Sequence, residues 1–105
     1  MATTTERVEE VAAAFAAVEG ELGDLPSILE DEQQGQLSEG EWLTRSMEWG
    51  QAISFLRFVL DPAYRAGQMT PSQAERYRQL LRALQDALPL LQRLGFTLPQ
   101  ISLQP

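Results

Sequence analysis

Apolar residues recur at helical spacing in three segments of the chain. In the first segment they stand three and four positions apart and form a narrow heptad seam, made up of Val8, Val11, Phe15, Val18 and Leu22. Such a seam is typical of a helix that packs against another helix. Thr3 and Glu6 could close its start as a capping box, whereas Gly23 weakens its end. We therefore predict a first helix over residues 4–22 and an acidic connector over residues 23–38.

The second segment is apolar on two sides. One side carries a bulky stripe of Trp42, Trp49, Ile53, Leu56 and Leu60. Leu43, Met47 and Phe58 lie more than a quarter-turn away, on a different side. Ser38, which can form a capping box with the glutamate that follows three residues later, begins a helix that we predict over residues 39–60. A helix with two apolar sides is either central in a bundle or covered by a second molecule, and both readings stay open.

The third segment is a one-sided amphipathic helix. Its apolar arc consists of Tyr77, Leu80, Leu81, Leu84, Ala87, Leu88, Leu91 and Leu94. Thr70 caps its start, Gln73 completes the capping box, and Gly95 ends it. We predict a helix over residues 71–94, kinked where Pro89 removes a backbone hydrogen bond.

The C-terminal segment is too short to form a further helix of useful length. It contains apolar residues, among them Leu98 and Ile101, but Pro99 interrupts them, so we expect an extended strap over residues 95–105. The whole pattern predicts an all-α three-helix bundle that forms a single domain over residues 1–105. The second and third helices would form an antiparallel hairpin, with the first helix packed on it or projecting toward a second copy.

The composition removes most catalytic chemistry. The chain has 105 residues and contains neither cysteine nor histidine. It therefore lacks thiolate chemistry, the commonest general base and the commonest metal ligand. A glycine-rich phosphate loop is also missing, and the paired carboxylates stand at helix starts, where the helix dipole accounts for them. We predict a protein that is not an enzyme and that needs no cofactor or metal.

One acidic segment partly resembles a calcium-binding loop. Residues 30–41 place oxygen-bearing side chains, a glycine and a final glutamate in the register of an EF-hand loop. However, Glu30 stands where the loop has a short aspartate, and Gln34 supplies a neutral ligand. A turn at Gly35 and the capping box at Ser38 account for the same residues, so no metal site is predicted here.

Charge divides the chain into two parts. Residues 1–41 carry eleven acidic residues and one arginine, a net charge of −10, and residues 42–105 carry four acidic residues and seven arginines, a net charge of +3. The sum is −7, and this asymmetry can orient a partner or a second copy. The start of the chain lacks a signal-peptide pattern, and no apolar run approaches the roughly 20 residues of a membrane span. We expect a cytoplasmic protein that does not enter the membrane.

These observations favour a non-enzymatic protein–protein interaction module, such as an adaptor, a small assembly subunit or a regulator. It would bury apolar helix surface against a partner protein or in a homo-oligomer, through Trp42, Leu43, Met47, Phe58, Leu98 and Ile101. The alternative is a small transcriptional regulator that binds nucleic acid through the arginine face of the third helix, represented by Arg76, Arg78 and Arg82. The acidic net charge argues against this alternative, because basic residues dominate nucleic-acid-binding surfaces.

Overall fold

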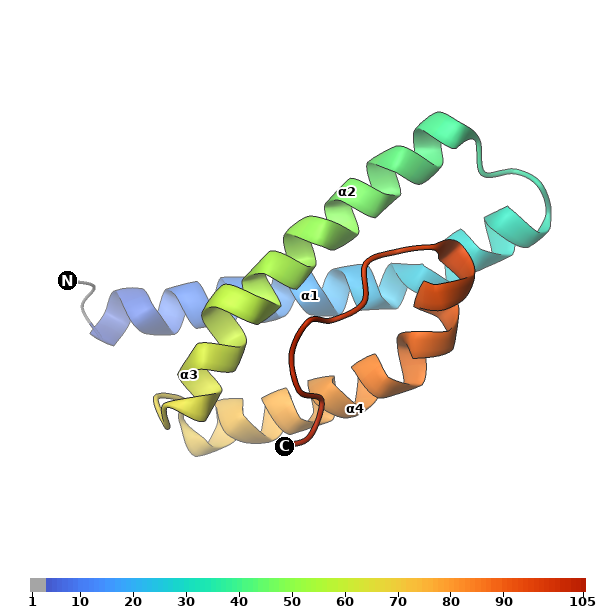
Figure 1. The fold of residues 1–105 in the computed structure, drawn as a ribbon. Coiled ribbons are helices and arrows are strands. Elements are labelled where there is room, and N and C mark those ends of the chain that lie inside the picture. The colour runs from blue at the N-terminus through green and yellow to red at the C-terminus, as the bar shows by residue number, and fades with distance from the viewer. Residues whose placement is uncertain (1–3) are drawn as a thin grey trace.

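The computed structural model describes residues 4–105, with side chains described from residue 8 onward, and is built from helices (Figure 1). The elements in chain order are α1 (Thr4–Gln33), α2 (Glu39–Phe55), the π-helical segment η1 (Leu56–Leu60), α3 (Asp61–Arg65) and α4 (Pro71–Leu94). Because α2, η1 and α3 follow one another without a break, the chain forms three long helical rods. No strand occurs within residues 4–105, and the predicted all-α three-helix class is confirmed.

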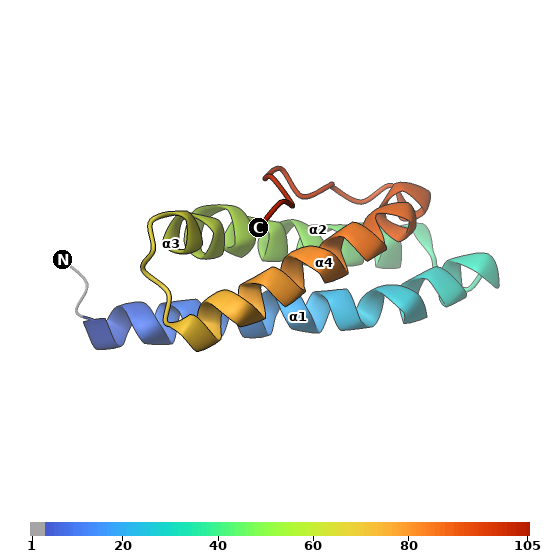
Figure 2. The ribbon, with the colours of Figure 1, turned by 90° about the horizontal axis from the view of Figure 1, so that it is seen from below.

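The helices alternate in direction, and α1 is the element on which the others pack. Both α2 with η1 and α4 pack against α1. The predicted antiparallel arrangement of the second and third helices is present, but the two diverge along their length, and the C-terminal segment runs back between them (Figures 1 and 2). Figure 2 shows this segment on the side of the molecule away from α1. It forms neither helix nor strand over residues 96–105.

The prediction that the first helix ends at residue 22 is wrong. α1 continues through Gly23 and Pro26 to Gln33. The reason is burial: Leu25 and Ile28, which stand three and six residues after Leu22, are buried in the core. Burying two large aliphatic side chains contributes roughly 3 to 6 kcal/mol, and this exceeds the propensity cost of a glycine and offsets that of a proline.

The predicted acidic connector over residues 23–38 therefore shrinks to residues 34–38. Gly35 adopts a left-handed backbone with φ of +70°, and the amide of Gln36 donates to the carbonyl oxygen of Asp31 at 2.8 Å. This is the usual glycine stop of a helix. The first-helix capping box predicted at Thr3 and Glu6 lies outside the residues whose side chains are described.

Gly23, in the middle of α1, is a position where substitution should raise the stability of the chain. A Cβ atom placed on Gly23 would have no neighbour within 4 Å, and its φ is not in the left-handed range. We expect Gly23→Ala to raise the free energy of unfolding by about 0.5 to 1 kcal/mol, because alanine has the higher helix propensity and restricts the unfolded chain. Urea unfolding measures this change. Gly35→Ala is the control and should destabilise, since its positive φ strains any residue with a Cβ.

Helix ends follow the predicted capping chemistry closely. At the start of α4, Thr70 Oγ1 accepts from the amide of Gln73 at 3.1 Å, and Gln73 Oε1 accepts from the amide of Thr70 at 3.0 Å. At the start of α2, Ser38 Oγ accepts from the amide of Glu41 at 3.1 Å, but the reciprocal bond runs from the Ser38 hydroxyl to the Glu41 carboxylate at 2.8 Å. Gly95 ends α4 with φ of +72°.

The prolines in the second and third rods change the helices without ending them. In η1 the amide of Asp61 donates to Leu56, five residues earlier. This wider turn leaves room for the ring of Pro62, which in a regular α-helix would collide with the carbonyl four residues before it. α4 likewise continues through Pro89 and changes direction in its last turns (Figure 1).

The core lies where the three rods meet. Its largest fully buried side chains are Trp49, Tyr77, Phe15, Leu25, Leu56, Leu60, Leu81, Leu84, Leu91 and Val18. They come from one face of each rod, and in the second rod this face is the predicted bulky stripe. The opposite face of that rod contributes nothing to the core, and the candidate interaction surface lies on this face. Among the described helices, none combines the length and the apolarity needed to cross a membrane.

Candidate interaction surface

Four large apolar side chains stay exposed along one side of α2 and η1. The exposed fractions are 54% for Leu43, 62% for Met47, 43% for Phe55 and 67% for Phe58. We call these four residues the outer stripe. At about 100° per helical residue, Leu43, Met47 and Phe58 fall within an arc of about 60°, roughly opposite the centre of the buried face around Trp49. Folding of the single chain therefore leaves them in water.

A shallow groove lies in the C-terminal half of the outer stripe. It has a volume of about 400 Å³ and is lined by Gln51, Ser54, Phe55, Phe58 and Val59. The two phenylalanines and the valine make most of its wall apolar. The guanidinium of Arg57 stands 5.2 Å from the centre of the Phe58 ring and donates to Gln100 Oε1 at 2.9 Å. Arg57 thus links one groove residue, Phe58, to the C-terminal segment.

The polar side chains beside the outer stripe differ in whether they form hydrogen bonds within the chain. Ser54 donates its hydroxyl to the carbonyl oxygen of Gly50 at 3.2 Å, and Thr44 bonds to Gly40 in the same way at 3.1 Å. The side chain of Gln51 makes no hydrogen bond within the described part of the chain. Burial of this surface would therefore leave only Gln51 in need of a partner.

Two of the six predicted partner-binding residues are used inside the fold. Trp42 donates its indole N–H to the carbonyl oxygen of Leu94 at 2.7 Å, and its ring packs on Phe96 with centroids 6.0 Å apart. Ile101 is partly buried against the core. Leu98 is exposed, on the segment that passes along α2. The structure thus brings Leu43, Met47 and Phe58 together on one surface, and assigns Trp42 and Ile101 to internal packing.

Sequence reasoning missed Phe55. It stands three residues before Phe58 and eight after Met47, so its helical position places it beside the second apolar side. Its position is ambiguous in the sequence, because Phe55 falls between the bulky buried stripe and the second apolar side of the helix. In the structure it forms one wall of the groove.

The C-terminal segment is held by side chains from both neighbouring rods. Trp49 donates its indole N–H to the carbonyl oxygen of Thr97 at 2.7 Å, and Gln85 of α4 donates to the carbonyl oxygen of Leu103 at 3.2 Å. Since the donors point to main-chain carbonyls, they fix the course of the segment without regard to its side chains.

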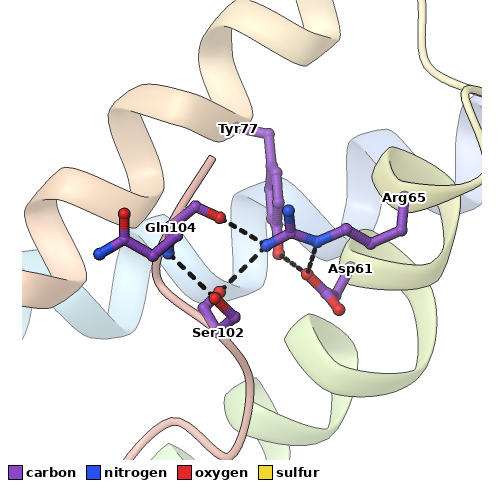
Figure 3. Close-up of polar contacts among 5 residues, drawn as sticks. All are labelled: Asp61, Arg65, Tyr77, Ser102 and Gln104. Carbon is purple, nitrogen blue, oxygen red and sulfur yellow. Dashed lines mark hydrogen bonds and ion pairs between the residues drawn. The ribbon is translucent and has the colours of Figure 1, made fainter.

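A polar cluster of Asp61, Arg65 and Tyr77 anchors the end of this segment (Figure 3). Arg65 donates to the carbonyl oxygens of Ser102 and Gln104 at 3.1 and 2.7 Å, and its Nε donates to the Asp61 carboxylate at 3.2 Å. The same carboxylate accepts from the Tyr77 hydroxyl at 2.8 Å. The cluster therefore joins α3, α4 and the C-terminal segment.

The cluster leads to a prediction about alkaline pH. Burial, followed by the hydrogen bond to Asp61, raises the pKa of Tyr77 well above its ordinary value of 10.0. Below pH 10 the folded and unfolded chains both keep the proton, and above it the unfolded chain loses the proton first. Stability should therefore fall as pH rises beyond 10, by up to about 1.4 kcal/mol per pH unit.

Urea unfolding between pH 8 and 11 measures this dependence. Tyr77→Phe should lose about 1 kcal/mol at pH 8, where the hydrogen bond is removed, but should show a shallower decline above pH 10. Parallel declines in the two proteins would contradict the assignment of this titration to Tyr77.

Two of the three arginines of the predicted nucleic-acid-binding face, Arg76 and Arg78, are engaged by carboxylates. The guanidinium of Arg76 binds both carboxylate oxygens of Glu19 and lies 4.6 Å from the centre of the Phe15 ring. Arg78 donates to Glu75 at 2.8 and 3.1 Å. No ion pair joins Arg82 to a carboxylate among the described residues. The structure thus does not present the predicted arginine face as a free cationic surface.

One carboxylate on α1 and one on α4 have pKa values shifted in opposite directions. Burial raises the pKa of Glu21, with smaller contributions from Glu48 and Asp24. The hydrogen bond and charge of Arg78 lower the pKa of Glu75. Among the side chains of residues 8–105, no group of three potential ligands among histidine, cysteine, aspartate and glutamate is close enough to hold a metal ion.

No family model, no curated protein and no solved structure matches this chain. The assignment of a function therefore rests on the surface of the molecule itself.

Proposed function

We propose that the protein is a non-enzymatic interaction module that binds a protein surface through the outer stripe of Leu43, Met47, Phe55 and Phe58. One observation carries the proposal. These side chains are 43 to 67% exposed on α2 and η1, and Leu43, Met47 and Phe58 lie on the face opposite the core. Isolated exposed apolar residues are ordinary on protein surfaces, but an aligned group beside an apolar groove is typical of a docking site.

The exposed area is large enough to matter for binding. A phenylalanine side chain offers about 200 Å², so the 67% exposure of Phe58 corresponds to about 130 Å². Burying that area would contribute roughly 3 kcal/mol before the costs of association. An aromatic anchor of this kind is expected to cost at least about 2 kcal/mol of binding when it is truncated.

A photo-crosslinking phenylalanine analogue tests the proposal. Placed at position 58 in the full chain and irradiated in cells, it should give a protein adduct, whether with a second copy or with a different protein. The matched control is the same analogue at Gln79, an exposed position on α4. The adduct should disappear when Met47→Asp is added to the chain. Equal labelling at positions 58 and 79 would overturn the proposal.

Stability measurements separate binding from folding. Leu43→Ala, Met47→Ala and Phe58→Ala should each change the free energy of unfolding of the isolated chain by no more than about 0.5 kcal/mol, as expected for exposed positions. If they lower stability while association is unchanged, the stripe belongs to the core and not to an interface.

The nucleic-acid alternative gains no support from the described residues, because Arg76 and Arg78 are already paired with Glu19 and Glu75. Its test is a salt titration of DNA binding, in which phosphate contacts would give a steep loss of affinity. The absence of cysteine is compatible with a cytoplasmic location, which stays a prediction.

A further inference from the structure

The groove beside Phe58 has the form of a hole for a side chain from a facing helix. Four of its lining residues, Gln51, Ser54, Phe55 and Phe58, stand at positions i, i+3, i+4 and i+7. In paired helices four residues at this spacing surround a single inserted side chain. With a volume of about 400 Å³, the groove has room for a long, narrow apolar group.

Met47 has the properties of the inserted side chain. It is 62% exposed, and a methionine is unbranched and adapts to irregular gaps. At 1.5 Å per residue it stands about 11 Å along the helix from the middle of the groove in its own chain. It can therefore fill a groove only in another molecule.

The stripe is self-complementary about a point between Gly50 and Gln51. A two-fold axis at that point places Met47 opposite Ser54 and Leu43 opposite Phe58, because the members of each pair are equally far from it along the sequence. Under this symmetry the Met47 side chain of each copy reaches the groove of the other. Isologous contacts of this kind are the commonest way in which identical chains associate.

We propose that a second copy of this chain covers the outer stripe, with the two α2 helices antiparallel and Met47 of each copy seated in the groove of the other. This arrangement rests on the proposed function, and it identifies the partner protein as a second copy of the chain.

Charge favours the antiparallel orientation over the parallel one. The start of α2 carries exposed Glu39 and Glu41, whereas the other end of the stripe carries exposed Arg57. Glu39 and Arg57 are about five helical turns apart and so lie on the same flank. Antiparallel pairing sets the acidic end of one copy beside Arg57 of the other, while parallel pairing sets like charges together.

The centre of the stripe permits close approach without leaving buried groups unsatisfied. A Cβ atom on Gly50 would have no neighbour within 4 Å, so the single chain does not require glycine there, and its absence of a side chain lets two helices approach. Ser54 is already bonded to the Gly50 carbonyl. Gln51 lies next to the axis, where its amide can pair with Gln51 of the second copy, and a buried polar pair of this kind fixes register.

The first test is the mass of the purified full chain in solution. Because one helix face per copy is buried, the interface is at the small end of specific interfaces, so sedimentation equilibrium should extend to several hundred micromolar. The mass should rise with concentration from 11.7 kDa toward twice that value. Met47→Asp should weaken association at least tenfold with unchanged helix content, whereas Gln79→Asp on α4 should leave it unchanged.

The second test is disulfide cross-linking, which is clean because the chain has no cysteine. A disulfide needs Cβ atoms about 3.5 to 4.5 Å apart. Gln51→Cys, beside the axis, should cross-link with itself under mild oxidation. Met47→Cys should cross-link with Ser54→Cys in a mixture, and should not do so with itself. Self-linking of Met47→Cys but not of Gln51→Cys in this mixture series would indicate parallel pairing and overturn the proposal.

A mass of 11.7 kDa at every concentration would also overturn the second-copy assignment. The proposed interaction function would then be tested separately, with the photo-crosslinking phenylalanine analogue at position 58. An adduct with a different protein keeps that function and rejects self-association, and no adduct above the level at Gln79 rejects both.

Discussion

Replacing Trp49 by alanine is expected to lower the free energy of unfolding by about 3 to 5 kcal/mol, the largest effect of any single substitution considered for this chain. Trp49 is fully buried where the three rods meet, so its truncation leaves a cavity that the surrounding helices can fill only in part. Its indole N–H also donates to the carbonyl oxygen of Thr97 at 2.7 Å, and that bond is lost as well.

Two further variants separate the contributions of buried area, of the indole hydrogen bond and of position. The stability of each is measured by urea unfolding with circular dichroism as the signal. Trp49→Phe keeps much of the buried area but removes the indole donor, and it should cost about 1 to 3 kcal/mol. Phe58→Ala removes a smaller aromatic ring from the exposed face and should cost no more than about 0.5 kcal/mol. If Trp49→Ala and Phe58→Ala were equally stable, the division of α2 into a buried and an outer face would be wrong.

Deletion of residues 97–105 is expected to lower the free energy of unfolding by about 3 to 6 kcal/mol. The segment supplies carbonyl acceptors for Trp49, Arg65 and Gln85, and each such bond contributes about 0.5 to 1.5 kcal/mol. It also covers core residues between the diverging second and third rods with Ile101 and Leu103. Since a domain of this size has only about 5 to 15 kcal/mol of stability, the truncated chain should be marginally folded.

Shorter changes show which part of the segment matters. Deletion of residues 104–105 removes the Gln104 carbonyl contact to Arg65 and the exposed bond from the Gln104 amide to Ser102 Oγ, and it should cost about 1 kcal/mol. Ile101→Ala should cost more than Leu98→Ala, because Ile101 packs on the core and Leu98 is exposed. A full deletion that unfolds at the same urea concentration as the intact chain would show that the segment is not part of the folded unit.

Local chemistry predicted the helix ends well. The caps at Ser38 and Thr70 and the glycine stop at Gly95 depend on hydrogen bonds between residues a few positions apart, so a sequence contains all that is needed to find them. The start and end of α4 were predicted to the residue for this reason. The same holds for the two apolar sides of α2, since helical periodicity alone places Leu43 and Met47 away from Trp49.

Non-local burial explains the errors. The first helix was predicted to end at residue 22 because Gly23 has a low helix propensity. Leu25 and Ile28 are nevertheless buried in the core, and the free energy of this burial depends on contacts with other helices. The hydrogen bond of Trp42 has the same origin, because the carbonyl of Leu94 lies 52 positions away and local sequence does not indicate it.

The sequence by itself determined the all-α class, the caps and stops of the helices, and the presence of more apolar surface on α2 than one neighbouring helix covers. These properties follow from periodicity and from contacts between near neighbours in the chain. Only the tertiary structure decided which apolar side of α2 is buried, because α1 and the C-terminal segment both contact the side that carries Trp49. This packing leaves Leu43, Met47, Phe55 and Phe58 exposed to water, and it depends on contacts between residues far apart in the sequence.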